Sequence, residues 1–97
     1  MDEYSVKITS QAKEQITLIR NHIAFELKEP ERAKRVIHSL REEGKKLSYM
    51  PTRIKCIEEQ PWGGMGYRRI IVENYYLYFW IDEELKIVYV IAIDIQE

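Results

Sequence analysis

The chain has 97 residues, the usual size of one domain, with 45% hydrophobic and 32% charged residues. A net charge of −1 gives no overall attraction to nucleic acid, so any basic site must be local. No apolar run approaches the roughly 18–20 residues of a membrane span, and the N-terminus lacks an apolar signal region. We therefore expect one domain over residues 1–97, cytoplasmic and not bound to a membrane.

The residue types that metal sites and disulfides require are scarce. Cys56 is the only cysteine, which excludes an internal disulfide, and His22 and His38 are the only histidines. This is too few for a zinc-type ligand set. We expect neither a metal nor another cofactor.

In chain order, residues 3–9 predict a short strand, because Tyr4, Val6 and Ile8 alternate with polar side chains. Thr9 and Ser10 can then cap the N-terminus of a helix. The apolar side chains of this helix recur at helical spacing, opposite a polar face; they are Ala12, Ile16, Ile19, Ile23 and Leu27.

A second helix is predicted to begin near Pro30, which suits the first helical turn, and to end at Gly44. Its apolar stripe consists of Ala33, Val36, Ile37 and Leu40. Two amphipathic helices in succession form a hairpin that needs one apolar surface to cover.

The next stretch, residues 47–66, has little periodicity, and its prolines and glycines mark irregular structure. It carries four charged side chains of interest: Arg53, Lys55, Glu58 and Glu59. We expect it to be a mobile, functional loop.

Residues 66–93 predict three consecutive strands, with turns at Glu73-Asn74 and at residues 82–84. The middle strand has two distinct faces: Leu77, Phe79 and Ile81 on an apolar one, and Tyr76, Tyr78 and Trp80 on an aromatic one. Residues 87–93 are apolar on both faces, which favours a central strand. The order β-α-α-β-β-β predicts an α+β fold, with the helical hairpin on one face of a mostly antiparallel four-stranded sheet.

Several stretches keep a characteristic order and spacing. They are VKITSQAKEQI in residues 6–16, EPERAKRVI in residues 29–37, Leu47-x-x-Met50-Pro51-x-Arg53, Gly66-x-Arg68, Val72-x-Asn74-Tyr75, Leu77-Tyr78-Phe79, Ile81-Asp82-Glu83 and Val88-x-Val90. In these stretches, and over nearly its whole length, the chain resembles the RelE/ParE superfamily of bacterial toxins from type II toxin–antitoxin systems.

The resemblance implies one of two activities. RelE-like members cleave messenger RNA in the ribosomal A site, using cationic and hydrogen-bonding side chains on the sheet face and C-terminal tail. ParE-like members poison DNA gyrase and are not enzymes. Either way the resemblance implies a cognate antitoxin as partner, in a toxin–antitoxin hetero-oligomer.

The nuclease residues of the family carry over poorly. Nuclease members typically have an Arg after the hairpin Tyr, where this chain has Tyr76, and basic residues beyond the last strand, where it ends Asp94-Ile95-Gln96-Glu97. RNA cleavage needs a general base, a general acid and cationic stabilisation of the transition state. ParE-like members also tend to have a basic tail, but binding tolerates a lost contact better than catalysis does.

A local group of basic residues remains as candidate target or phosphate contacts: Arg53, Lys55, Arg68 and Arg69. In a nuclease, Glu58 or Glu59 would be the base, and Lys55, Arg68 and Arg69 would contact phosphate. Neighbours on a strand point to opposite faces, so Arg68 and Arg69 cannot line one surface. The alternative is a solvated strand end in which Arg68 pairs with Glu58 or Glu59.

The aromatic face of Tyr76, Tyr78 and Trp80 exceeds what a monomer usually exposes, which favours a covered partner site. It could stack bases or receive an antitoxin segment, or simply be the outer face of the sheet. Because the nuclease residues are mostly missing, the resemblance to the RelE/ParE superfamily implies a ParE-like toxin that binds DNA gyrase. The alternatives are a RelE-like ribosome-dependent mRNA endoribonuclease and a degenerate, non-toxic member that still binds antitoxin.

Overall fold

The computed structural model of the protein describes residues 3–96. Strand β1 (Ser5–Ile8) is followed by helix α1 (Ser10–Asn21), a π-helix (His22–Glu26) and helix α2 (Pro30–Lys45). Strands β2 (Arg68–Val72), β3 (Tyr75–Asp82) and β4 (Ile87–Ile95) complete the fold. The predicted order of elements is confirmed.

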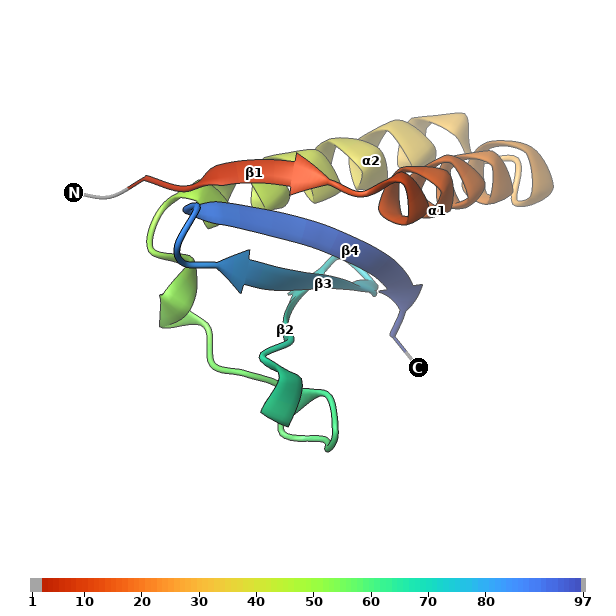
Figure 1. The fold of residues 1–97 in the computed structure, drawn as a ribbon. Coiled ribbons are helices and arrows are strands. Elements are labelled where there is room, and N and C mark those ends of the chain that lie inside the picture. Colours follow the sequence, from red (N-terminus) through yellow and green to blue (C-terminus); the bar gives the residue numbers. More distant parts are fainter. Residues whose placement is uncertain (1–2, 97) are drawn as a thin grey trace.

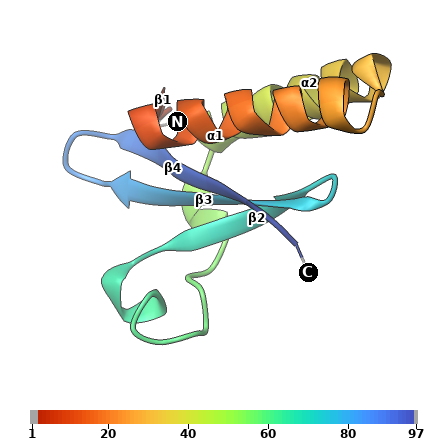
Figure 2. The same cartoon turned by 90° about the vertical axis from the view of Figure 1, so that its right-hand side faces the viewer.

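The strands form one sheet in the order β1-β4-β3-β2. Strands β2, β3 and β4 pair antiparallel as consecutive hairpins, and β1 pairs parallel with β4. This confirms the mostly antiparallel sheet and the central position of β4. Both helices lie over one face of the sheet, and the other face carries no α-helix within residues 3–96 (Figures 1 and 2).

The core lies between the helices and the apolar face of β3. Phe79 is 0% exposed and Leu77 is 2% exposed, and the stripe of α2 packs against the same cluster. The buried members of that stripe are Ala33, Val36, Ile37 and Leu40. The face predicted from the alternation in β3 is therefore the one that the helices cover.

Helix α1 is tied to the sheet at its first turn. The hydroxyl of Thr9 accepts a hydrogen bond from the backbone N–H of Ala12 at 3.2 Å, so Thr9 is the N-cap, as predicted. The same hydroxyl donates to the carbonyl of Ile91 at 3.3 Å, and Gln15 Oε1 accepts from the N–H of Ile93 at 2.7 Å. Side chains of α1 therefore contact the backbone of β4 beyond the end of β1.

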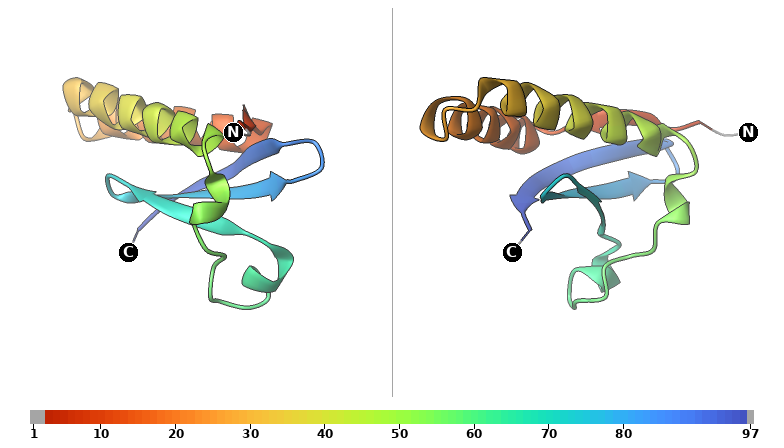
Figure 3. Two further views of the ribbon diagram at one scale, coloured as in Figure 1. Left: turned by 90° about the vertical axis from the view of Figure 1, so that its left-hand side faces the viewer. Right: turned by 180° about the vertical axis from the view of Figure 1, so that it is seen from behind.

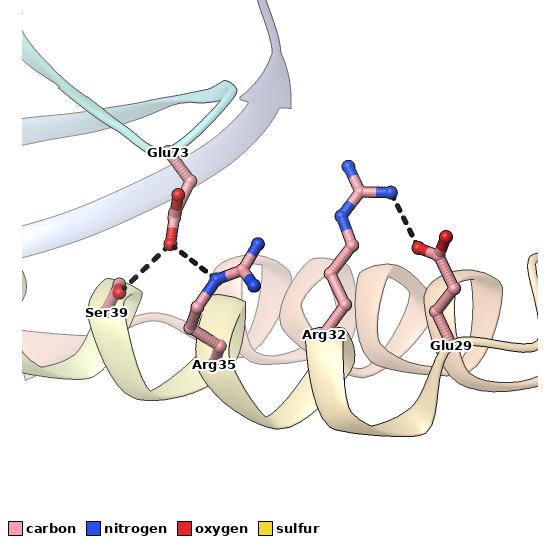
Figure 4. Close-up of polar contacts among 5 residues, drawn as sticks. All are labelled: Glu29, Arg32, Arg35, Ser39 and Glu73. Carbon is pink, nitrogen blue, oxygen red and sulfur yellow. Dashed lines mark hydrogen bonds and ion pairs between the residues drawn. The ribbon is translucent and has the colours of Figure 1, made fainter.

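Helix α2 is tied to the turn between β2 and β3 (Figure 4). Glu73 Oε1 accepts from Arg35 Nε at 3.4 Å and from the Ser39 hydroxyl at 3.3 Å. At the start of the helix Arg32 pairs with Glu29 at 2.9 Å, and this hydrogen bond raises the pKa of the Arg32 guanidinium above its ordinary value. The two contacts of Glu73 join α2 to the hairpin, whereas the Arg32–Glu29 pair lies within the start of the helix.

Two details of the predicted helices are wrong. Leu27 is 45% exposed, because the turn before it is a π-helix closed by the Leu27 N–H to His22 carbonyl bond, which shifts the phase of the apolar stripe. Gly44 does not end α2, which continues to Lys45 and has a right-handed cap at Lys46. Gly44 is buried instead, where the helix lies against Leu77 of the sheet.

The segment between α2 and β2 leaves the helical layer and projects beyond the sheet on its other side (Figure 3). It contains three short 3₁₀ turns, at Lys46–Ser48, Pro51–Arg53 and Gly63–Met65. The backbone N–H of Ile57 donates to the carbonyl of Tyr67 at 2.9 Å, which joins the segment to the start of β2. The expected irregular structure is confirmed, and its mobility stays a prediction.

We predict that Gly44→Ala stabilises the fold by about 0.5–1 kcal/mol, because alanine loses less backbone entropy than glycine within a helix. The added methyl group would meet Leu77 Cδ1 at 3.9 Å, an ordinary contact. Urea unfolding of both proteins measures the difference in the free energy of unfolding.

Gly66→Ala is the matched control and should destabilise the fold by about 1–3 kcal/mol. Gly66 has a φ of +90°, and a methyl group there would lie 3.2 Å from Trp80 Nε1. Equal effects of the two substitutions would contradict the assigned backbone conformations.

Candidate functional site

The face of the sheet opposite the helices, called here the open face, carries the aromatic side chains of β3. In the strand register Arg69 of β2 lies beside Tyr78, and Asp94 of β4 lies beside Tyr76. Residues paired across strands share a face. The alternation that buries Leu77 and Phe79 therefore brings Arg69, Tyr78 and Asp94 to the open face.

The aromatic residues of the open face pack against one another rather than standing free. The rings of Tyr76 and Tyr78 have centroids 5.9 Å apart, and Trp80 stacks on Tyr89 at 6.4 Å. Trp80 is 37% exposed, while the two tyrosines are half-buried. The three residues predicted as a partner-binding face thus belong to two aromatic pairs on the open face.

A hollow of about 530 Å³ lies on the open face, and we call it the open-face hollow. Of the three predicted aromatic residues, Tyr78 lines it and Tyr76 and Trp80 do not. Its walls come from the loop before β2, from the three antiparallel strands and from the first turn of α1. The lining residues are Gln11, Ile57, Glu59, Trp62, Tyr67, Arg69, Tyr78, Ile91, Ala92 and Asp94. Trp62 and Tyr67 were not predicted as site residues, because nothing in the sequence pattern of the loop indicates that the loop folds back toward the strands.

Arg69 is held in place by three neighbours. Its Nη2 lies 3.4 Å from Glu59 Oε1, and its guanidinium carbon lies 4.3 Å above the ring of Tyr76. Partial burial alone would lower the pKa of the Arg69 guanidinium, but a hydrogen bond with Tyr78 and the charge of Glu59 outweigh it and raise that pKa above its ordinary value. Arg69 is therefore a fixed cation whose charge Glu59 offsets.

Arg68 points to the opposite face from Arg69, as predicted from the strand geometry. Its Nη1 donates to the backbone carbonyl of Ile54, and its Nε is buried without a hydrogen-bond partner. The alternative in which Arg68 pairs with Glu58 or Glu59 is not what the structure shows, because these carboxylates pair with Lys55 and Arg69.

The structure brings some of the candidate nuclease residues together. Lys55, Glu58, Glu59 and Arg69 line a second, smaller hollow of about 330 Å³ beside the loop. Lys55 Nζ lies 3.2 Å from Glu58 Oε1, with both side chains more than 80% exposed (84% and 82%). Arg53 lies apart from this hollow and donates to the carbonyls of Tyr49 and Met50 at 2.7 and 3.1 Å.

A third hollow, of about 290 Å³, lies on the helix side of the sheet, and we call it the helix-side hollow. It opens between β1 and the two helices, over an apolar floor. The lining residues are Val6, Ile8, Ile16, Leu40, Arg41, Gly44, Lys45, Leu77, Val90 and Ile93. Its charged lining is basic, whereas the open-face hollow has two carboxylates and one guanidinium.

The histidines lie on the helices, and His22 Nδ1 is 2.6 Å from Glu26 Oε2. Within residues 3–96 no three His, Cys, Asp or Glu side chains converge as a metal site would require. None of the helices in this range is both long and apolar enough to span a bilayer.

Three solved structures share this fold over almost the full chain. A toxin–antitoxin structure described as the chromosomal ParDE system of P. aeruginosa matches with a TM-score of 0.80 at 22% identity, covering 100% of both chains. The RelBE2 complex of Mycobacterium tuberculosis matches with a TM-score of 0.69 at 22% identity, covering 97% of this chain and 99% of that one. The archaeal RelE–RelB complex of Pyrococcus horikoshii OT3 gives 0.61 at 15% identity, with 99% and 97% covered.

The chain therefore has the fold of these ParE- and RelE-type proteins, as the sequence resemblance implied. The profile of the family described as ParE toxin of type II toxin–antitoxin system, parDE, matches residues 6–97. The chain belongs to this ParE toxin family. A search among curated protein sequences gives no significant match.

We predict that Arg68→Ala lowers the free energy of unfolding by about 1–3 kcal/mol, because it leaves the half-buried Ile54 carbonyl without its charged donor. Lys55→Ala should change it by less than about 0.5 kcal/mol, since that ion pair is exposed to solvent. Urea unfolding of the two variants measures this. If Arg68→Ala were as stable as wild type, Arg68 would be free to contact a partner.

Proposed function

We propose that the chain inhibits growth as a ParE-like toxin, by binding a macromolecular target without cleaving it. DNA gyrase is the favoured target, and a cognate antitoxin neutralises the toxin. The family match supports this proposal, as does the similarity to a ParDE system.

The charge of the open face is the main observation that supports a toxin that does not cleave its target. Stabilising a cleaved phosphodiester requires preorganised cations directed at the phosphate. In the open-face hollow Arg69 is offset by Glu59, and Asp94 leaves the lining with one net negative charge. Arg68, the neighbouring cation, is directed to the Ile54 carbonyl on the other face. Such a surface favours a protein partner over a phosphate.

One observation favours RNA cleavage as a second candidate function. Lys55, Glu58, Glu59 and Arg69 share the smaller hollow beside the loop, so a base and two cations stand within one site. In this reading Glu58 or Glu59 would take the proton of the attacking hydroxyl, and the cations would contact the phosphate.

The helix side of the sheet offers a docking surface for the antitoxin. The helix-side hollow offers an apolar floor with Arg41 and Lys45 at its rim, which suits an apolar segment that carries acidic residues. Strand β1 is an edge strand, and a partner can add a strand or lay a helix beside it. We assign the antitoxin to this surface.

Induced expression without antitoxin tests the function, with growth, messenger RNA integrity and DNA damage signalling followed in one culture. We expect growth arrest with filamentous cells and a DNA damage response, while messenger RNA stays intact. Translation-dependent RNA cleavage would support the nuclease instead. Folded protein that causes no arrest would show a degenerate, non-toxic member.

The antitoxin surface is tested by Arg41→Glu combined with Lys45→Glu. We expect this variant to bind the cognate antitoxin at least about tenfold more weakly, because two charges at the rim are reversed. Lys34→Glu, at an exposed position near the start of α2, is the control. Calorimetric titration gives the Kd values, and unchanged binding by the double variant would place the antitoxin elsewhere.

A further inference from the structure

We infer that the open-face hollow binds a basic segment of the toxin's target protein, seating an arginine or lysine side chain against its aromatic walls and Asp94. This inference rests on the proposed function and specifies the chemistry of the partner. It assigns the site to a cationic protein segment. A nuclease would instead bind the anionic phosphates of RNA there.

The first support is charge. The lining of the open-face hollow contains the carboxylates of Glu59 and Asp94 against the single guanidinium of Arg69. Glu59 lies 3.4 Å from that guanidinium, so the pair is neutral as a unit, and the exposed carboxylate of Asp94 remains. Outside the hollow, Lys55 and Glu58 also neutralise each other at 3.2 Å. An incoming cation therefore meets an uncompensated negative charge, and an incoming phosphate does not meet a free positive one.

The second support is the aromatic lining. Trp62 and Tyr67 lie in the wall with ring centroids 6.5 Å apart, and Tyr78 lies on the floor. Trp62 is 52% exposed, so its ring is accessible to a ligand. Cations bind the faces of such rings, and tryptophan is the strongest partner. The protein already makes this contact on the same face, where the Arg69 guanidinium lies 4.3 Å above Tyr76.

The third support is the contrast with the helix-side hollow. The open-face hollow crosses β2, β3 and β4 at Arg69, Tyr78 and Ala92, a path that an extended segment can follow. The helix-side hollow lies on the other face of the sheet, and its charged lining is basic: it consists of Arg41 and of Lys45, which pairs with Glu42 at 3.4 Å. Two partners of opposite charge can thus be accommodated separately. Since the antitoxin is assigned to the basic rim, the acidic, aromatic hollow is assigned to the target.

The test uses the full chain with Trp80→Phe. Of the two tryptophans in the sequence, this variant keeps Trp62 alone. A short peptide with two arginines is titrated while Trp62 fluorescence is followed. The same peptide with citrulline, which has the shape of arginine but no charge, is the control, and a single-stranded oligonucleotide is the anionic probe. We expect the arginine peptide to bind more tightly than the other two. Tighter binding of the oligonucleotide, or equal binding of the citrulline peptide, would overturn the inference.

Variants locate the binding. Asp94→Asn should weaken arginine-peptide binding by about fivefold, the effect of losing one exposed ion pair. Glu84→Gln, which removes the same charge from the turn between β3 and β4, should change it by less than about twofold. Arg69→Ala should strengthen binding, because it removes a competing cation and frees Glu59. Weaker binding by Arg69→Ala, or an equal loss in Glu84→Gln, would overturn the assignment.

Expression in cells separates the target from the antitoxin. Folded Asp94→Lys should lose growth arrest and still co-purify with the antitoxin. Retained arrest, or loss of antitoxin binding, would overturn the assignment of this hollow to the target. If wild type itself causes no arrest, the proposed function fails, and the peptide titrations still decide whether the hollow binds a basic segment.

Discussion

The packing of β3 under the two helices governs the rest of the structure. Phe79 and Leu77 are nearly inaccessible to solvent, and their burial against α2 fixes which residues of β3 face inward. Because side chains alternate along a strand, the same packing directs Tyr76, Tyr78 and Trp80 outward. A shift of one residue would exchange the core and the candidate site. The core and the candidate site of this protein therefore depend on one register.

The features that could be predicted from the sequence are those that local rules determine. Alternation located the buried face of β3, and the hydroxyl of Thr9 marked the start of α1. The position of Leu27 could not be predicted, because a π-helical turn changes the helical phase without a sequence signal. A glycine such as Gly44 commonly marks a helix end, yet α2 continues to Lys45. Packing does not require a glycine there, because an added methyl group would meet Leu77 at an ordinary 3.9 Å.

The candidate site was only partly predictable, because its walls come from segments that are far apart in sequence. The opposite orientation of Arg68 and Arg69 follows from strand geometry alone. Their partners do not: Arg69 contacts Glu59 ten residues away, and Arg68 contacts the backbone of Ile54. Trp62 and Tyr67 join Asp94 around one hollow only because the loop before β2 folds back toward the sheet. The charge of that hollow therefore depends on the tertiary structure and not on any single stretch of sequence.

The contacts of α1 with β4 also limit how this protein can associate. Strand β1 ends at Ile8, paired with Val90, so the later residues of β4 have a neighbouring strand only on the β3 side. Exposed backbone at such a border is a template for uncontrolled pairing with other chains. Thr9 and Gln15 occupy the carbonyl of Ile91 and the N–H of Ile93, as a fifth strand otherwise would. These two polar side chains thus protect the sheet against aggregation along this border, and direct strand addition to the outer edges of β1 and β2.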